Sequence, residues 1–200
     1  MKRSVYIATS LDGYIARADG SLDWLEHDSG GDDYGFAAFM NGIDTIVMGR
    51  NTFEQVLTFG QWPYGERRFV VLSRTKTSFD VPDFVTARIE VSSEKPRDLL
   101  DSLEQRGACH VYVDGGGIIQ AFVADGLIDE ITISRIPVLL GGGIGLFGPR
   151  NSDVQLEHVV TRAFPSGVVQ STYRINDRAC SLPALSPGAD DLSSPTDEHG

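Results

Sequence analysis

The chain has 200 residues, of which 41% are hydrophobic and 22% charged, and its formal net charge is −11. A chain of this length is expected to form one domain, with or without a tail. The acidic balance argues against a broad nucleic-acid surface and a polybasic membrane contact, because both need clustered Lys and Arg. The sequence contains no window of about 18 uninterrupted apolar residues, so we expect no membrane span.

Two cysteines, Cys109 and Cys180, are too few for a disulfide framework. We therefore expect reduced thiols in a cytoplasmic protein. The opening Met1-Lys2-Arg3 precedes an apolar run that is too short for a signal peptide.

The composition changes near Asp177. Residues 177–200 are acidic, rich in Ser and Pro, and almost without aliphatic clusters. Such a segment cannot bury enough apolar surface to offset the entropy lost on ordering. We expect a disordered tail there, with a short partner-binding motif as the alternative, after a single domain over residues 1–176.

The first half of this domain alternates buried strands with helical patterns. Short apolar runs predict strands, whereas apolar residues at helical spacing, such as Phe36, Phe39 and Met40, predict helices. The predicted elements are a strand at 4–10, a polar loop at 18–33, a helix at 33–40, a strand at 45–48, a helix at about 51–57 and a strand at 68–72.

The second half continues the alternation and ends in a hairpin. Pro96 suits the first turn of a helix, and Pro165-Ser166-Gly167 suits a hairpin turn. The predicted elements are a weakly signalled strand within 81–91, a helix at 96–106, a strand at 109–113, a helix at 118–124, a strand at 128–136, a Gly-rich loop at 137–150, and strands at 155–163 and 168–175. This order predicts an α/β fold with a mostly parallel mixed sheet, helices on both faces and a C-terminal antiparallel hairpin.

Three predicted strands end in residues suited to phosphate. These ends are Gly49-Arg50-Asn51-Thr52, Leu72-Ser73-Arg74 and Asp114-Gly115-Gly116-Gly117. Ligands of open α/β sheets bind beyond the carboxyl ends of the strands. Arginine gives charge-assisted bonds, glycine admits close backbone approach, and helix N-termini favour anions. Singly, a Gly triplet is more often a tight turn and a lone Arg is more often solvated, but together they predict a pocket for a ligand with several phosphates.

Other catalytic templates find no match. The four histidines (His27, His110, His158 and His199) lack metal-ligand spacing, so we expect no metal site. A literal GxGxxG occurs at 143–148, but Pro149 follows it where a helix should begin. We interpret that segment as a mobile or packed loop rather than a dinucleotide site.

The motifs together resemble a known family. Blocks 44–54, 70–74 and 111–117 resemble dihydrofolate reductase, whereas 10–16 and 126–140 are closer to the C-terminal reductase domain of bifunctional riboflavin-biosynthesis proteins. The whole of 1–176 resembles small stand-alone bacterial members of the dihydrofolate reductase-like group. The resemblance implies their three-layer fold.

The resemblance also implies NADPH as the cofactor. It assigns the phosphates to Gly49, Arg50 and Thr52, and the adenosine 2′-phosphate to the strand end Leu72, Ser73 and Arg74. A second group would bind the pyrophosphate and the nicotinamide: Gly115, Gly116, Gly117, Ile118 and Ile119 for the former, Ala8 and Ile15 for the latter. The loop 13–28, with Trp24, would close over the cofactor and exclude water.

Two carboxylates are candidates for the substrate side. Asp33 has the spacing of the substrate-binding acid of dihydrofolate reductase and would deliver a proton. Alternatively, it stabilises the start of a helix, and Asp32 could take its place. Asp114 occupies the position of an acidic residue in the riboflavin reductases and would contact the substrate or the nicotinamide, although a turn-forming Asp is an equal alternative.

The chain departs from the riboflavin reductases at Tyr14, where those enzymes carry a lysine that helps to hold a ribose phosphate. A basic substrate clamp is therefore not evident. The aromatic residues of 34–39 and 62–64 suggest a flat substrate, with core packing as the alternative. We expect Tyr14, Trp24 and Phe36 on the substrate side.

These inferences converge on an NADPH-dependent reductase that transfers hydride to a small planar heterocycle, pteridine- or pyrimidine-like, or to another unsaturated substrate. One alternative is riboflavin-pathway reduction of a ribosylaminouracil phosphate. Two others are a non-catalytic NADP-binding protein and a structural dimerisation module. The riboflavin relatives are dimers, so the resemblance also implies a homodimer.

Overall fold

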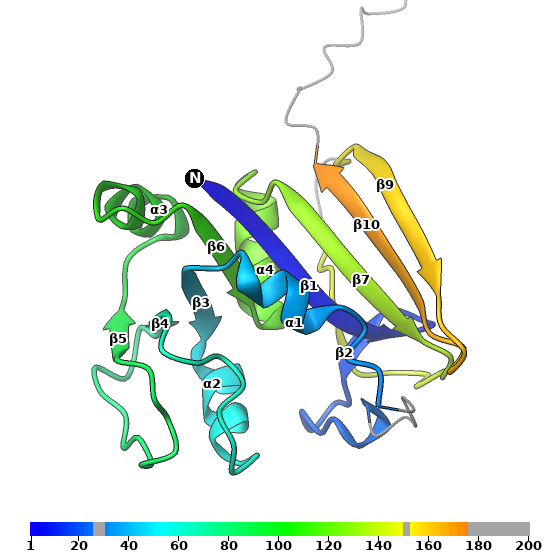
Figure 1. The fold of residues 1–200 in the computed structure, drawn as a ribbon, viewed down its shortest axis with the longest axis horizontal. Coiled ribbons are helices and arrows are strands. Elements are labelled where there is room, and N and C mark those ends of the chain that lie inside the picture. The colour runs from blue at the N-terminus through cyan, green and yellow to red at the C-terminus, as the bar shows by residue number, and fades with distance from the viewer. Residues whose placement is uncertain (26–30, 150–152, 176–200) are drawn as a thin grey trace, which may run out of the picture.

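The computed structural model describes residues 1–25, 31–149 and 153–175. The predicted acidic tail lies outside these residues. An eight-stranded sheet runs in the order β5-β4-β3-β6-β1-β7-β10-β9, from left to right in Figure 1. Its strands are β1 (Lys2–Ser10), β3 (Thr45–Gly49), β4 (Arg68–Leu72), β5 (Ile89–Ser92), β6 (His110–Asp114), β7 (Glu130–Ile136), β9 (Leu156–Ala163) and β10 (Val169–Ile175). The six strands from β5 to β7 are parallel, and β10 is antiparallel to both of its neighbours.

Helices cover both faces of the sheet, as predicted. They are α1 (Phe36–Asn41), α2 (Arg50–Leu57), α3 (Pro96–Gln105) and α4 (Gly116–Ala124). Alternate residues of β3 point into two different cores. Val47 packs with α3 and α4, whereas Ile46 and Met48 pack with α1 and α2. This period-2 alternation explains why the parallel strands form nearly continuous apolar runs.

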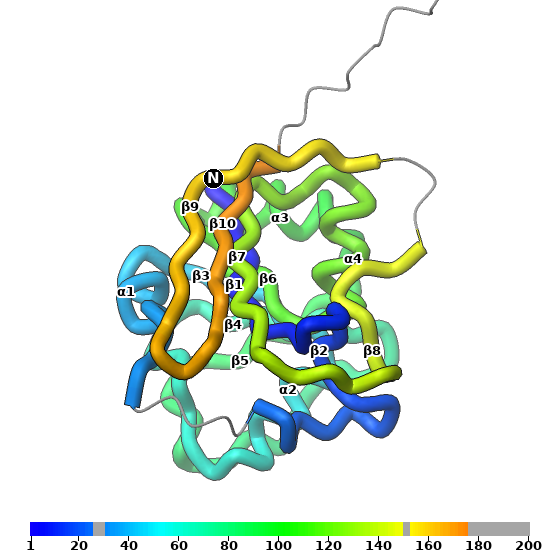
Figure 2. The backbone as a smooth tube through the Cα atoms, turned by 90° about the vertical axis from the view of Figure 1, so that its right-hand side faces the viewer, coloured from blue at the N-terminus to red at the C-terminus, as the bar shows by residue number. Residues whose placement is uncertain are grey.

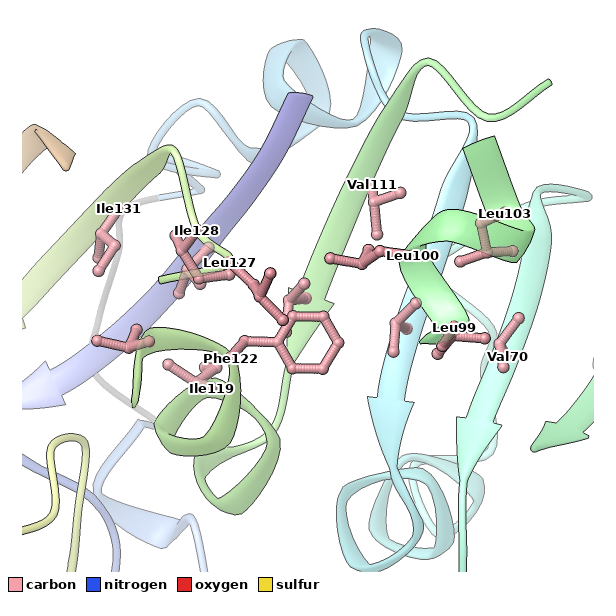
Figure 3. Packing of buried hydrophobic residues seen from close by; sticks show 14 of the residues in the cluster. Val70, Leu99, Leu100, Leu103, Val111, Ile119, Phe122, Leu127, Ile128 and Ile131 are labelled. Atoms are coloured by element: carbon pink, nitrogen blue, oxygen red, sulfur yellow. The ribbon is translucent and has the colours of Figure 1, made fainter. Parts of the chain in front are cut away.

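The core beneath α3 and α4 is aliphatic. Leu99, Leu100 and Leu103 of α3 project onto the sheet, and Ile119 and Phe122 of α4 fill the space beside them (Figure 3). Each such side chain contributes about 1.5–3 kcal/mol when fully buried. The opposite core, beneath α1 and α2, is mostly aromatic, with Phe53, Phe69 and Tyr112 among its rings. The two cores hold the helices against opposite faces of the sheet.

A second, two-stranded sheet was not predicted. It joins β2 (Tyr14–Ala16) to β8 (Ile144–Gly145), which lies within the predicted Gly-rich loop (Figure 2). Asp12 links the residues just before β2 to those just before β8, because its carboxylate accepts the N–H groups of Leu140 at 3.2 Å and Gly141 at 2.8 Å. Strands this short carry no periodic pattern, so sequence alone cannot reveal them.

Other elements begin or end a few residues away from their predicted bounds. The first helix begins at Phe36 rather than 33, α4 begins at Gly116 rather than 118, and the weakly signalled strand is confined to Ile89–Ser92. The predicted loop at 18–33 contains a short 3-10 helix, Asp23–Leu25. The GxGxxG segment contains β8 instead of being loop throughout, and Gln120 donates a hydrogen bond to the carbonyl of Gly145 at 2.9 Å.

Candidate functional site

Two adjoining cavities open at the carboxyl edge of the parallel strands. The larger one, cavity 1, has a volume of about 880 Å³, and cavity 2 has a volume of about 580 Å³. Both are lined by Asn51, Thr52, Gly115 and Gly117, so the start of α2 and the turn before α4 form their common border. One elongated ligand could therefore occupy both cavities.

Cavity 2 lies at the N-termini of three helices. The N-cap residues of α2, α3 and α4 are Gly49, Lys95 and Gly115. None of the three forms a side-chain hydrogen bond that caps its helix. Each helix start therefore keeps backbone N–H groups that need an acceptor, and the helix dipole favours an anion there. Gly49 and Gly115 line the cavity directly, as does Lys95.

The basic side chains of cavity 2 are not neutralised within the described residues. Arg50, Arg74 and Lys95 line the cavity, and none forms a salt bridge in that part of the chain. Ser73 lines the same cavity, and its Oγ accepts the N–H group of Lys76 at 2.9 Å. Its own hydroxyl proton can be donated to a ligand. These groups together suit a phosphate.

The three glycines before α4 differ in what surrounds them. Gly115 has φ +97°, and a Cβ there would lie 2.5 Å from Oγ1 of Thr52. A Cβ on Gly116 would overlap the tip of Ile15, a residue of the cavity 1 wall. A Cβ on Gly117 would meet nothing within 4 Å, although Gly117 lines both cavities. The backbone at Gly117 is thus open to a ligand.

Asp114 is one of two acidic residues that line cavity 1, and the other is Asp19. Asp114 ends β6, and its Oδ1 accepts the N–H group of Gly115 at 2.7 Å. Burial raises the pKa of Asp114 from 3.8 to about 6, against the opposing effect of the Gly115 N–H group and the hydroxyls of Tyr112 and Tyr64. The carboxyl group can therefore hold or release a proton near neutral pH.

The remaining walls of cavity 1 are mostly apolar and come from distant segments. Ala8 and Tyr6 line it from β1, Ile15 and Ile144 line it from the β2–β8 pair, and a segment at 18–22 closes one side. Gln55 ties that segment to α2, because its Nε2 donates to the carbonyl of Gly20 at 3.0 Å.

Most of the predicted cofactor residues lie together at these cavities. Ala8 and Ile15 line cavity 1, and the predicted residues of the three strand ends line cavity 2, cavity 1 or both. Ile119 is the exception among them. Its side chain is buried in the α3–α4 core, and its N–H group donates to the carbonyl of Gly115 at 2.8 Å. It stabilises the first turn of α4 instead of facing a cavity.

Asp33, predicted as the proton donor, lies elsewhere. Its carboxylate accepts the N–H groups of Ala37 at 2.9 Å and Gly35 at 2.8 Å at the start of α1, and these bonds lower its pKa. Asp32 is also a turn residue, accepting the N–H group of Tyr34 at 2.7 Å. The helix-start alternative therefore describes Asp33, which is not among the lining residues of either cavity.

The predicted substrate residues are not among the lining residues either. Phe36 packs between α1 and the sheet, 5.9 Å from the ring of Tyr6. Tyr14 belongs to β2, beside cavity 1. Trp24 is buried against Ile136 and Val168, and its Nε1 has no hydrogen-bond partner among the described residues. Core packing explains Phe36 and Trp24.

Sequence reasoning missed several lining residues. In cavity 2 these are Ser92, Ser93, Glu94, Lys95 and Pro96, which join β5 to α3. The signal was available, because Pro96 marked a helix start that follows a strand. In cavity 1, Gln55, Asp19 and Ile144 were also missed. Nothing local in the sequence marks those three.

The part of the chain that the structure describes contains neither a metal-binding cluster nor a membrane-spanning helix. In that part of the chain, no three His, Cys, Asp or Glu side chains come together in a way that could hold a metal ion. None of the described helices combines the length and the apolar character needed to cross a bilayer.

Comparisons with known proteins agree with this geometry. Residues 4–170 match the family model described as the RibD C-terminal domain. The chain is 32% identical over 169 residues to the uncharacterized protein YwjB of Bacillus subtilis (strain 168), a match that covers 84% of this chain and 94% of YwjB.

Solved structures extend the comparison. A crystal structure from Shewanella sp. PV-4, provisionally assigned to riboflavin biosynthesis, has a TM-score of 0.80 and 40% identity, covering 88% of this chain and 99% of that one. Dihydrofolate reductase from Enterococcus faecalis, complexed with NADP(H), has a TM-score of 0.60 and 18% identity, covering 88% and 97%. The resemblance predicted from the motifs is confirmed: the chain belongs to the RibD C-terminal domain family and shares its fold with reductases.

Proposed function

We propose that this protein is an NADPH-dependent reductase of a small planar heterocycle, pteridine- or pyrimidine-like, or of another unsaturated compound. The observation that carries the proposal is the pair of joined cavities at the carboxyl edge. Cavity 2 offers three helix N-termini and cations that form no ion pair among the described residues, and cavity 1 offers mostly apolar walls and the carboxyl groups of Asp19 and Asp114. A dinucleotide with a phosphorylated end and a flat, uncharged or singly charged end matches that division.

The residues present fit NADPH. Ser73 and Arg74 would hold the 2′-phosphate, and the open backbone at Gly117 would admit the pyrophosphate beside the starts of α2 and α4. Ala8 and Ile15 would pack against the nicotinamide. When bound, NADPH supplies the hydride. The similar enterococcal enzyme is complexed with NADP(H), which agrees with this choice.

The side chains of the protein would position the reactants and transfer a proton. Apolar side chains around cavity 1 would exclude water from the reacting ring. Asp114 would carry the proton, because it lines cavity 1 and its pKa of about 6 permits both protonation states near neutral pH. Asp33 has no part in this proposal, since its carboxylate is occupied at the start of α1.

A position in the cytoplasm and a homodimer belong to the same proposal. Cys109 is an exposed free thiol, which suits a reducing compartment. The edge strand β9 exposes Leu156, Val159 and Val160, which a second copy could cover. Light scattering on the full chain would measure the oligomeric state.

A non-catalytic NADP-binding protein is the rival that shares cavity 2. It predicts affinity for NADPH without oxidation of NADPH in the presence of any acceptor. A structural module without a ligand predicts no dinucleotide affinity.

The test inserts a side chain where the ligand should lie. In Gly117→Leu the new side chain would enter the open space common to both cavities, so NADPH affinity should fall by about tenfold or more. Gly142→Leu is the matched control, because Gly142 is equally open but lines neither cavity. Thermal unfolding would check that both variants fold. Unchanged NADPH affinity in folded Gly117→Leu would reject the proposal.

A further inference from the structure

A third cavity, cavity 3, is separate from the proposed dinucleotide site. Its volume is about 180 Å³, and its walls come from β1, the start of α1 and one face of β7, β10 and β9. Among the described lining residues it shares Tyr6 with cavity 1 and none with cavity 2. Because pockets for drug-sized ligands measure about 300–1,000 Å³, cavity 3 suits a smaller molecule.

Two rows of side chains across the sheet form the floor of cavity 3. Thr172 of β10 lies opposite Thr132 of β7 and Val160 of β9. Two residues along β10, Gln170 lies opposite Arg162 of β9. Side chains two residues apart on a strand point to the same face of the sheet, so all five line one cavity. Cross-strand neighbours have Cβ atoms about 4.5–5.5 Å apart, which places Arg162 beside Gln170.

The side-chain amide of Gln170 has its nitrogen occupied and its oxygen available. Gln170 is 7% exposed, and its Nε2 lies 2.7 Å from Oη of Tyr6, 2.9 Å from Oγ of Ser134 and 3.0 Å from the carbonyl oxygen of Tyr34. The carbonyl of Tyr34 can only accept, so the nitrogen of the amide must face it. Oε1 accepts no hydrogen bond from the described residues. A buried amide oxygen needs a donor, and a ligand in cavity 3 can supply one.

Opposite charges flank cavity 3. Arg162 is exposed and forms no salt bridge among the described residues, so its guanidinium can bind a carboxylate. Asp33 stands on the opposite wall, directly before Tyr34. The hydroxyl of Tyr6 lies in the field of both charges. Its pKa is raised chiefly by burial, and the charge of Asp33 raises it further whereas that of Arg162 lowers it. A molecule with one positive and one negative group matches this arrangement.

We propose that cavity 3 binds a small zwitterion of the α-amino acid class, with its carboxylate on Arg162 and its ammonium group on Oε1 of Gln170. The hydroxyls of Thr132 and Thr172 lie 2.9 Å apart, and their mutual hydrogen bond uses one of their two protons. The other proton can be donated to the carboxylate. Ala38 leaves room for a short aliphatic side chain. This site lies outside the cavities assigned to hydride transfer, so the inference goes beyond the proposed function.

The first test separates the two charges of the ligand. The full chain is titrated with L-alanine, L-lactate and L-alaninamide, and NMR follows the side-chain amide of Gln170 and the backbone amide of Gly35. L-Lactate lacks the ammonium group and L-alaninamide lacks the carboxylate. L-Alanine should give saturable shifts, and each analogue should bind at least about tenfold more weakly, because one charge-assisted bond is lost.

A charge variant tests the carboxylate contact. Arg162→Gln should weaken L-alanine binding by about tenfold or more and leave the affinity for L-alaninamide unchanged, since that probe carries no carboxylate. Arg88→Gln is the control for the lost positive charge, because Arg88 lies outside all three cavities. It should bind L-alanine as the parent protein does.

A steric variant leaves every charge and polar group in place. In Ala38→Leu the larger side chain would fill cavity 3, so L-alanine binding should be lost. Ala37→Leu is the matched control, because Ala37 is also an exposed residue of α1 but lines none of the three cavities. Thermal unfolding would check that both variants fold. Both should bind NADPH as the parent does, so failure of the proposed function is recognised separately.

Three results would overturn the inference: no saturable L-alanine binding to the parent protein, equal affinity for the three probes, or unchanged L-alanine binding in folded Ala38→Leu. The probe series uses the parent protein alone, so it decides the question even where a variant fails to fold.

Discussion

The two cavities share a border but are built differently. Cavity 2 is formed by three strand-to-helix turns and by the segment that follows β4, each a few consecutive residues, and its chemistry is that of helix N-termini and cations. Cavity 1 is assembled from β1, the β2–β8 pair, the segment at 18–22 and the start of α2. The ends of the parallel strands are therefore sufficient to form cavity 2. The segments that form cavity 1 are distant in sequence, and they determine which part of a ligand can bind there.

The largest effect should come from the border between the cavities. Gly115→Ala would force an alanine to φ +97° and bring its Cβ onto Oγ1 of Thr52. Strain and overpacking together should lower the free energy of unfolding by about 3 kcal/mol. Urea titration of the variant would measure this loss.

Gly117→Ala is the matched comparison, because its Cβ meets open space. It should unfold at or slightly above the parent's urea midpoint, since alanine lowers the entropy of the unfolded chain. Equal destabilisation by the two substitutions would contradict the distinct environments described for these glycines.

The next largest effect should be a pH-dependent change in folding stability that comes from Asp114 in cavity 1. The folded chain holds the proton of Asp114 more tightly than the unfolded chain, as its pKa is raised from 3.8 to about 6 by burial. Ionisation therefore costs folding stability as the pH rises from about 4 through 6. At pH 8, Asp114→Asn should exceed the parent in stability by up to about 3 kcal/mol, with the difference vanishing below pH 4.

Denaturant unfolding between pH 3.5 and 8 would follow this difference. A carboxyl group that is freely hydrated would instead leave the stability difference independent of pH. That outcome would remove the physical contrast between Asp114 and an ordinary surface acid.

The smallest effect should come from Asp33, outside both cavities. Asp33→Ala removes the acceptor of two N–H groups at the start of α1, which should cost about 1 kcal/mol. NADPH affinity should be unchanged. Asp83→Ala, another exposed acid, should alter neither stability nor affinity. A large loss of NADPH affinity in Asp33→Ala would restore Asp33 to the site.

The sequence allowed a good prediction of cavity 2 because its residues are local. Arg50, Ser73 and Arg74 follow apolar strands directly, and the ends of parallel strands must meet at one edge. The sheet, the helices on both faces and the terminal hairpin were predictable for the same reason: strand and helix periods are properties of short windows.

The substrate side could not be predicted in the same way. Whether Asp33 reaches a cavity depends on how α1 docks, and rings decide this: Phe39 lies on Tyr6 with centroids 4.7 Å apart and an interplanar angle of 26°. The side chain of Phe36 packs against Tyr6 in the same cluster of rings. Ile144 reaches cavity 1 only through a two-residue strand that pairs with β2. Such tertiary choices leave no periodic mark in the sequence.

On the proposed function, the two cavities form one dinucleotide site whose phosphorylated end lies in cavity 2. Its most direct test is calorimetric titration with NADPH and NADH of the parent, Arg74→Ala and the control Arg88→Ala, whose arginine lies outside both cavities. The parent and the control should prefer NADPH, and Arg74→Ala should lose about tenfold or more in NADPH affinity while NADH affinity stays constant. Equal affinity of the parent for both dinucleotides, or no binding of either, would contradict the account.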